Sequence, residues 1–144
     1  MRIKTFWLSW FGPGLLVLGL DRLVKIEYKR NILSFLIHNS GMAFGLLKGN
    51  AFPILAVSLL LILMCFFLLR GVRPSGLAPI ALSMIAGGAV GNMIDRLLYG
   101  YVLDMFPFFN WFVFNVADVG VIAGAILCGW SLLFRPQDWR KKEQ

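Results

Sequence analysis

Four long apolar segments constrain the fold of this 144-residue chain more than any other feature of its sequence. They cover about residues 6–25, 51–69, 76–99 and 111–134, and each approaches the ~20 residues that a helix needs to cross a bilayer. Hydrophobic residues make up 59% of the chain, above the roughly one half that is typical of soluble domains. The sequence therefore predicts an all-α membrane protein, a single domain built as a bundle of four transmembrane helices.

Basic residues lie mostly outside these segments and indicate an orientation. With four spans, both termini and the turn at 70–75 share one side, which carries Arg2, Lys4, Arg70, Arg73, Arg135, Arg140, Lys141 and Lys142. The other side carries Arg22, Lys25, Lys29, Arg30, Lys48 and Arg96. This weak excess favours cytoplasmic termini. The basic flanks suit phospholipid headgroups, and we expect no nucleic-acid partner because the charges form no continuous stripe.

The loops on the outer side are themselves apolar. Residues 32–37 read as a short strand, Ser40 and Gly41 as a turn, and 42–47 as a returning segment, which together predict a small β hairpin. The alternative is a loop that merely lies on the bilayer. Residues 101–110 are rich in aromatic side chains and suit the headgroup level.

Polar residues interrupt three of the apolar segments at helical spacing. The pairs or triplets are Asp21 with Lys25, Asn92 with Asp95 and Arg96, and Asn115 with Asp118. Residues three or four apart share one face of a helix, and ionisable groups at membrane depth usually face the bundle interior or a watery cavity. We therefore expect one shared polar site near the outer surface.

Asp104 follows the third apolar segment and lies 14 residues before Asp118. Both can therefore lie at one membrane depth. Two carboxylates held close together share a proton, so that one can activate water while the other polarises a carbonyl. Taken alone, this spacing is a weak signal for catalysis. Structural pairing is the better reading of Asp21 with Lys25 and of Asp95 with Arg96.

Other chemistries have little support in the sequence. The single histidine, His38, and the lack of a GxSxG motif argue against serine catalysis and against a metal site. We expect no metal and no cofactor. Cys65 and Cys128 lie inside apolar segments and read as small core residues. Glycine pairs at GxxxG spacing, 87/91 and 120/124, predict close contacts between helices.

Five blocks of sequence resemble those of the lipoprotein signal peptidase (signal peptidase II) family. They are 20–25 (LDRLVK), 38–45 (HNSGMAFG), 87–96 (GGAVGNMIDR), 100–105 (GYVLDM) and 114–118 (FNVAD). No single block would be decisive, but their order over residues 21–118 makes the match specific.

The resemblance implies a bacterial inner-membrane aspartic endopeptidase with its active site near the outer face. Such an enzyme removes the signal peptide of a diacylglyceryl-modified prolipoprotein, cleaving just before the lipidated cysteine. The catalytic aspartates of the family fall on Asp104 and Asp118. Supporting and substrate-binding roles fall on Asp21, Lys25, Asn39, Gly41, Asn92, Asp95, Arg96 and Asn115. We expect a monomer whose partners are the substrate and membrane phospholipid.

The chain departs from the family pattern in two loops, 25–39 and 104–118, which look shorter than usual. We therefore expect a reduced extracytoplasmic β element. Two other functions compete with the peptidase. A small transporter or channel would use the aspartates to carry protons or ions, and a structural assembly partner would depend on the glycines alone and tolerate neutral isosteres at both aspartates.

Overall fold

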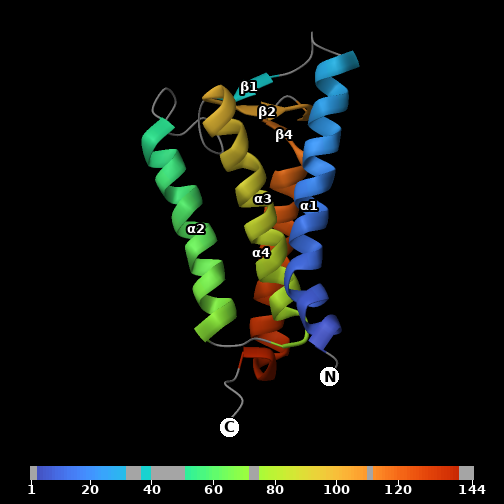
Figure 1. Ribbon diagram of the computed structural model, residues 1–144, viewed down its shortest axis with the longest axis vertical. Helices are drawn as coiled ribbons and strands as arrows, with labels where there is room; N and C mark the ends of the chain where they lie inside the picture. The colour runs from blue at the N-terminus through green and yellow to red at the C-terminus, as the bar shows by residue number, and fades with distance from the viewer. Residues whose placement is uncertain (1–2, 32–36, 40–50, 72–74, 110–111, 140–144) are drawn as a thin grey trace.

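The computed structural model describes residues 3–31, 37–39, 51–71, 75–109 and 112–139. Its helices are α1 Ile3–Asn31, α2 Ala51–Gly71, α3 Ala78–Tyr99, α4 Val116–Phe134 and the short 3-10 helix η3 Pro136–Trp139. Its strands are β1 Ile37–Asn39, β2 Val102–Asp104, β3 Phe106–Phe108 and β4 Phe112–Phe114. The strands gather at one end of a bundle of four long helices, opposite the end where α1 begins and η3 lies (Figure 1).

Helix α3 is the centre of the bundle, because α1, α2 and α4 all pack against it. Glycines allow the close approach that the GxxxG spacing predicts. A Cβ on Gly87 would collide with the backbone of Gly14 in α1, and one on Gly88 would collide with the carbonyl of Ala117 in α4. Even a single Cβ atom is therefore excluded where these helix backbones meet. The prediction of close helix contacts is confirmed.

Helix α1 continues through Pro13, where the sequence contains Gly12-Pro13-Gly14. Proline disturbs the hydrogen-bond ladder of a helix because its ring crowds the preceding turn. Gly14 N donates instead across the interface to Ser83 Oγ in α3, at 2.8 Å. A polar side chain of the central helix thus satisfies a backbone donor of α1 inside the bundle.

One prediction about the outer segments is wrong, and another stays a prediction. Residues 112–114 form β4, which pairs antiparallel with β3, so α4 begins at Val116 and not near residue 111. The predicted hairpin between 32–37 and 42–47 lies largely outside the described residues. Strand β1, at its edge, pairs antiparallel with β2, with Ile37 opposite Asp104. Sequence patterns gave no sign of this pairing.

The distribution of side chains is that of a membrane protein. Leu15 and Leu23 are about two-thirds exposed on the outside of α1, whereas Asp21 and Asp95 are completely buried. Charged groups that turn inward while large apolar groups turn outward suit a lipid surrounding. By length and composition, α3 and α4 are each able to cross a membrane, with mean hydropathies of 1.2 and 1.9.

The end of the bundle near η3 is closed by a buried carboxylate. Asp138 Oδ2 accepts hydrogen bonds from Leu77 N at 3.1 Å and from Ser131 Oγ at 3.3 Å. Trp139 Nε1 donates to the same Ser131 Oγ at 3.1 Å. Gly76 has a φ of 58° and faces the Asp138 carboxylate, where a Cβ would not fit. The C-terminal turn therefore caps the start of α3, where backbone N–H groups lack partners within the helix.

Candidate active site

Asn115 and Asp118 begin α4 with a reciprocal pair of hydrogen bonds. Asn115 Oδ1 accepts from Asp118 N at 2.9 Å, and Asp118 Oδ2 accepts from Asn115 N at 3.2 Å. This is a capping box, with an asparagine at the N-cap and a carboxylate three residues on. It fixes Asp118 in the first turn of α4, nearer the start of the helix than the predicted segment 111–134 implied.

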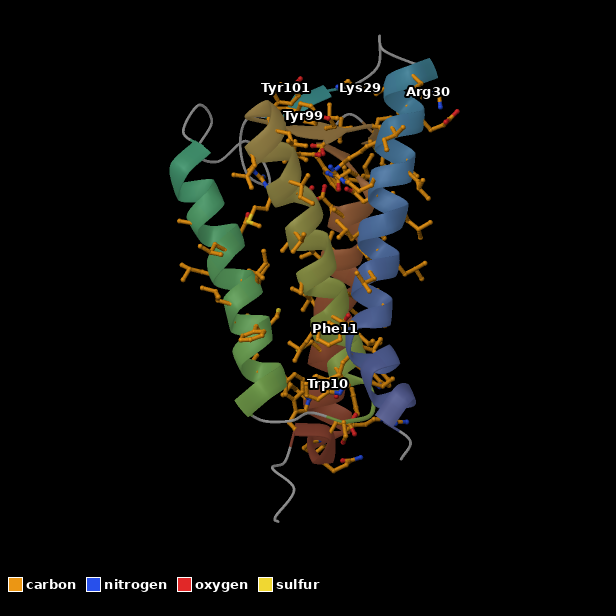
Figure 2. The ribbon with its side chains drawn as sticks, viewed as in Figure 1. Trp10, Phe11, Lys29, Arg30, Tyr99 and Tyr101 are labelled. Carbon is orange, nitrogen blue, oxygen red and sulfur yellow. The ribbon has the colours of Figure 1, made fainter. Side chains whose placement is uncertain are left out.

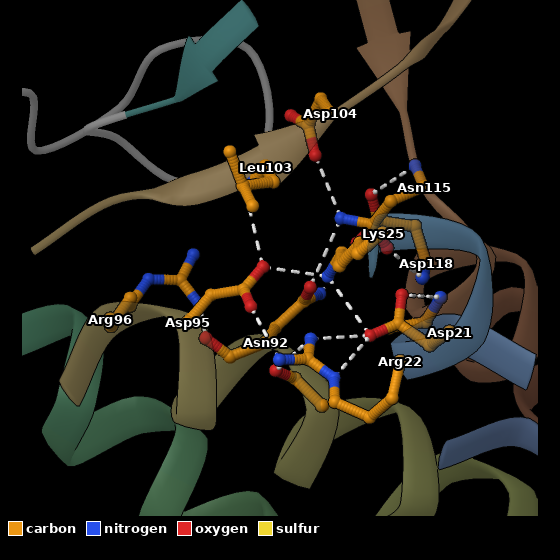
Figure 3. A network of polar contacts seen from close by, with 12 residues as sticks. Asp21, Arg22, Lys25, Asn92, Asp95, Arg96, Leu103, Asp104, Asn115 and Asp118 are labelled. Atoms are coloured by element: carbon orange, nitrogen blue, oxygen red, sulfur yellow. Dashed lines mark hydrogen bonds and ion pairs between the residues drawn. The ribbon is translucent and has the colours of Figure 1, made fainter. Parts of the chain in front are cut away.

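The side-chain amide of Asn115 connects this helix end to Asp104. Asn115 Nδ2 donates to Asp104 Oδ1 at 2.7 Å and to Asn92 Oδ1 at 3.0 Å. Asn92 Nδ2 in turn donates to Asp118 Oδ1 at 2.7 Å. Two asparagines thus link the two carboxylates, which belong to β2 and α4 (Figure 3). These bonds also determine the orientation of both amides, since each donor faces an oxygen.

A second group of charges lies beside this link, between α1 and α3. Lys25 Nζ lies 3.0 Å from Asp21 Oδ2 and 2.7 Å from Asp95 Oδ2. The guanidinium of Arg22 contacts the same two carboxylates, with Nη2 2.6 Å from Asp21 Oδ2 and Nη1 2.7 Å from Asp95 Oδ1. The predicted pair of Asp21 with Lys25 is confirmed. Buried charges of this kind are tolerated when they are paired.

These two carboxylates also hold backbone amides next to the Asp104–Asp118 pair. Asp95 Oδ2 accepts from Leu103 N at 3.1 Å, and Asp21 Oδ1 accepts from Ala117 N at 3.0 Å. The ion-pair group is therefore connected to the strand and the helix that carry the pair.

Arg96 lies on the same face of α3 as Asn92. Its Nη1 donates to the Asn92 carbonyl at 3.3 Å, and its charge interacts with Asp118, Asp104 and Asp95. Lys25 also acts on the charge of Asp118, so the charge of Arg96 is one of two described cationic charges that act on this carboxylate. The predicted brace between Asp95 and Arg96 stays a prediction, since the ion pairs seen at Asp95 join it to α1.

The structure brings eight of the predicted residues together, and all eight are labelled in Figure 3: Asp21, Lys25, Asn92, Asp95, Arg96, Asp104, Asn115 and Asp118. Asn39 lies in β1 opposite Val102, and only its backbone is described. Gly41 lies outside the described residues. Arg22 was missed, because it adjoins Asp21 in the sequence and does not share the spacing of Asp21 and Lys25.

The surroundings of the site differ from the rest of the bundle. Asp104 and Asn115 are almost completely buried, whereas Asp118 and Asn92 are half-buried. Figure 2 shows Lys29, Arg30, Tyr99 and Tyr101 at this end of the molecule, with Trp10 and Phe11 far below them. Within the described residues, no three His, Cys, Asp or Glu side chains are arranged to hold a metal ion. Two linked carboxylates in a partly open setting can hold a water molecule and share a proton.

Comparison with solved structures agrees with a membrane enzyme. The fold is similar to that of a bacterial membrane enzyme solved by the in meso method, with a TM-score of 0.77 and 25% identity, covering 99% of this chain and 95% of that one. A second solved structure of a bacterial membrane enzyme matches with a TM-score of 0.72 over 92% of this chain and 95% of that one, again at 25% identity.

Sequence comparison gives the family. The family model for signal peptidase (SPase) II matches residues 14–134. The lipoprotein signal peptidase of Moorella thermoacetica is 37% identical over 83% of this chain and 89% of its own length. That of Pelotomaculum thermopropionicum is 40% identical over 75% of this chain and 72% of its own. The chain belongs to the signal peptidase II family of aspartic peptidases. The transporter alternative gains no support from these relatives.

Proposed function

We propose that this protein removes the signal peptide from diacylglyceryl-modified prolipoproteins by cleaving just before the lipidated cysteine, with Asp104 and Asp118 as its catalytic pair. Membership of the signal peptidase II family supports the reaction. The observation that carries the assignment of the pair is the link Asp104–Asn115–Asn92–Asp118, in which each contact is 3.0 Å or shorter.

The charges around the site favour one shared proton. The group contains four carboxylates and three cations: Asp21, Asp95, Asp104, Asp118, Arg22, Lys25 and Arg96. Arg22 and Lys25 are paired with Asp21 and Asp95, and the charge of Arg96 acts on Asp104 and Asp118. A single proton on the Asp104–Asp118 pair makes the group neutral, and this suits a site that is largely buried within the bundle.

The reaction follows from that state. The ionised carboxylate takes a proton from a water molecule, whose oxygen attacks the scissile carbonyl carbon, while the protonated carboxyl donates to the carbonyl oxygen. When the tetrahedral intermediate collapses, the C–N bond breaks and the leaving amine receives the proton taken from water. Asn92 and Asn115 hold the two carboxylates in place. Neither carboxylate is assigned a fixed role, because such a pair titrates as a unit.

The membrane arrangement is part of the proposal. We infer that the chain is one domain whose four helices all cross the bacterial inner membrane, with cytoplasmic termini and the strands at the outer face. The side chains of α1 support a membrane-spanning position for this helix although it contains Asp21. Its polar residues face the bundle interior, and its apolar residues face outward. The protein acts as a monomer in contact with phospholipid.

The aromatic hairpin β3–β4 suits the lipid part of the substrate. Phe108 and Phe112 stack with ring centroids 5.2 Å apart, and Phe109 is 81% exposed. Exposed aromatic rings favour the boundary between headgroups and acyl chains. The signal helix enters laterally among the spans, and the diacylglyceryl chains stay in lipid beside this hairpin. Binding energy from these remote groups then helps to position the scissile bond.

Cleavage of a diacylglyceryl-modified prolipoprotein by the purified protein in detergent tests the proposal. Wild type should cleave, and Asp104→Asn and Asp118→Asn should each show no cleavage while remaining folded. Glu27→Gln is the matched control, because Glu27 is an exposed carboxylate of α1, and it should keep wild-type activity.

Inactive wild type would refute the reaction for this chain. Near-normal cleavage by either asparagine variant would leave the peptidase in place but refute the pair. Thermal unfolding and size-exclusion profiles of all four proteins separate a chemical loss from misfolding.

A further inference from the structure

The two proposed catalytic carboxylates are positioned through their neighbours in the chain. Asp95 Oδ2 accepts from the backbone of Leu103, one residue before Asp104, at 3.1 Å. Asp21 Oδ1 accepts from the backbone of Ala117, one residue before the second carboxylate, at 3.0 Å. Both anchoring carboxylates are completely buried. The position of each proposed catalytic carboxylate therefore depends on these anchors as well as on the link through Asn115 and Asn92.

Arg22 spans those two anchors. Its Nε and Nη2 lie 3.2 and 2.6 Å from Asp21 Oδ2, and its Nη1 lies 2.7 Å from Asp95 Oδ1. Its Nη2 also donates to the carbonyl of Gly91 at 3.0 Å. Four contacts on three groups fix the guanidinium plane relative to both α1 and α3.

Lys25 contacts the same anchors but constrains them less. Its ammonium is a single point charge on a flexible chain, whereas a guanidinium is a rigid planar fork. Lys25 is almost completely buried and Arg22 is 24% exposed. Lys25 therefore mainly neutralises the buried carboxylates, whereas Arg22, at the edge of the group, fixes the orientation of Asp21 relative to Asp95.

We propose that Arg22 is a positioning residue for catalysis, which sets the distance between Asp104 and Asp118 by fixing Asp21 against Asp95. It touches neither substrate nor the reacting atoms, and it acts through the backbone amides of Leu103 and Ala117. The proposal rests on the proposed function, because it assumes that this pair performs the cleavage.

Gly91 makes this arrangement possible. A Cβ at this position would lie 3.0 Å from Asp21 Oδ2 and 3.3 Å from the Ala117 methyl group. A larger residue would therefore press on the carboxylate that Arg22 holds, while the bare backbone leaves the Gly91 carbonyl open to the guanidinium.

The test compares steady-state cleavage of a diacylglyceryl-modified prolipoprotein by wild type, Arg22→Leu, Arg22→Lys and Asp138→Ala in the same detergent. A misplacement of about 1 Å costs roughly 100-fold in rate, so Arg22→Leu should lose roughly 10- to 100-fold in kcat with KM within about twofold. Arg22→Lys should recover only part of that loss, because it restores the charge without the fork. Asp138→Ala is the control for stability, since it lies at the other end of the bundle, and it should lower Tm while leaving kcat unchanged.

The outcomes are distinct. Equal kcat values for wild type and Arg22→Leu would overturn the positioning role alone, and so would a kcat loss that Asp138→Ala reproduces at the same Tm. Full recovery in Arg22→Lys would show that charge suffices and would also overturn it. If Arg22→Leu does not fold, Arg22→Lys decides: a reduced kcat at wild-type Tm supports the role, and wild-type kcat refutes it. Wild type without cleavage would refute the proposed function together with this inference.

Discussion

Each end of the bundle buries aspartate, and the two ends use it differently. Near η3, the carboxylate of Asp138 accepts from the backbone of Leu77 and the hydroxyl of Ser131, and these partners hold the start of α3. Near the strands, Asp104 and Asp118 are joined through two asparagine side chains and share the field of Arg96. The first arrangement closes a helix end. The second holds two carboxyl groups near each other, where ionisation of both costs stability, an arrangement typical of catalytic sites.

The comparison teaches that burial of a carboxylate does not by itself indicate chemistry. What distinguishes the strand end is the choice of partners. At the strand end, the donors are side-chain amides that link one carboxylate to the other. A change at one carboxylate therefore alters the surroundings of the other. Substitutions in the linked network at the strand end should therefore change the rate of cleavage, and those at Asp138 and its partners should change the free energy of unfolding.

Among residues other than the two aspartates, the largest effect is expected for Asn115→Ala. It removes the donor shared by Asp104 and Asn92 and also the N-cap of α4, so kcat/KM should fall by about 100- to 1000-fold and stability by about 1 kcal/mol. Asn115→Ser is the matched variant, because serine is also a good N-cap but lacks the amide donor. It should keep the stability and lose the activity. Wild-type activity in Asn115→Ser, measured by prolipoprotein cleavage, would contradict a role for the amide.

A smaller loss is expected for Asn92→Ala. It breaks the link at Asp118 Oδ1 while leaving the contact of Asn115 with Asp104 intact, so kcat should fall by up to about 100-fold. Ser83→Ala on the same helix is the control: it removes the acceptor of Gly14 N and should lower Tm only. If both variants reduce kcat equally, the effect belongs to α3 as a whole and not to the link.

Asp138→Ala should alter stability but not chemistry. Loss of an acceptor for the partly buried Leu77 N–H and for the buried Ser131 Oγ should lower the free energy of unfolding by about 1–3 kcal/mol. Denaturant titration in detergent measures this loss, and cleavage per folded molecule should stay at the wild-type rate. A rate loss well below the unfolding temperature would show that the two ends are coupled, which would break the comparison.

The smallest effect is expected for Lys29→Ala. Lys29 Nζ lies 4.5 Å from the centre of the Tyr99 ring, at an exposed position on the strand end. Such contacts contribute about 0.5–1 kcal/mol, and Lys29 has no described contact with the catalytic pair. Thermal unfolding should detect a slight change, and cleavage should not change. A large activity loss would extend the functional region beyond the network of Figure 3.

Much of the fold could be predicted because it rests on local patterns. Apolar length predicted the four long helices, and Gly100 ends α3 with a φ of 78°, as a glycine after the last helical turn favours. Helical spacing grouped Asp21 with Lys25 and Asn92 with Asp95, since those pairs depend on neighbours one turn away. The structure then brings these faces together through contacts between α1, α3 and α4.

The rest depends on contacts between distant segments. The pairing of β1 with β2 joins residues more than 60 positions apart, and no local pattern encodes it. The start of α4 was placed too early because Phe112–Phe114 is as apolar as the helix that follows. Arg22 was missed because its role depends on Asp95 in another helix and on the space that Gly91 leaves.

The central position of α3 has a consequence for the biosynthesis of the protein. Helices enter the membrane in the order of their synthesis, yet in the proposed arrangement the main partner of α1 is α3, which is made third. Asp21, Arg22 and Lys25 must therefore remain without Asp95 until α3 has been made. Asn115 and Asp118 come later still, so a nascent chain has no complete pair of carboxylates. If Asp104 and Asp118 are the catalytic pair, cleavage can begin only after α4 has been made.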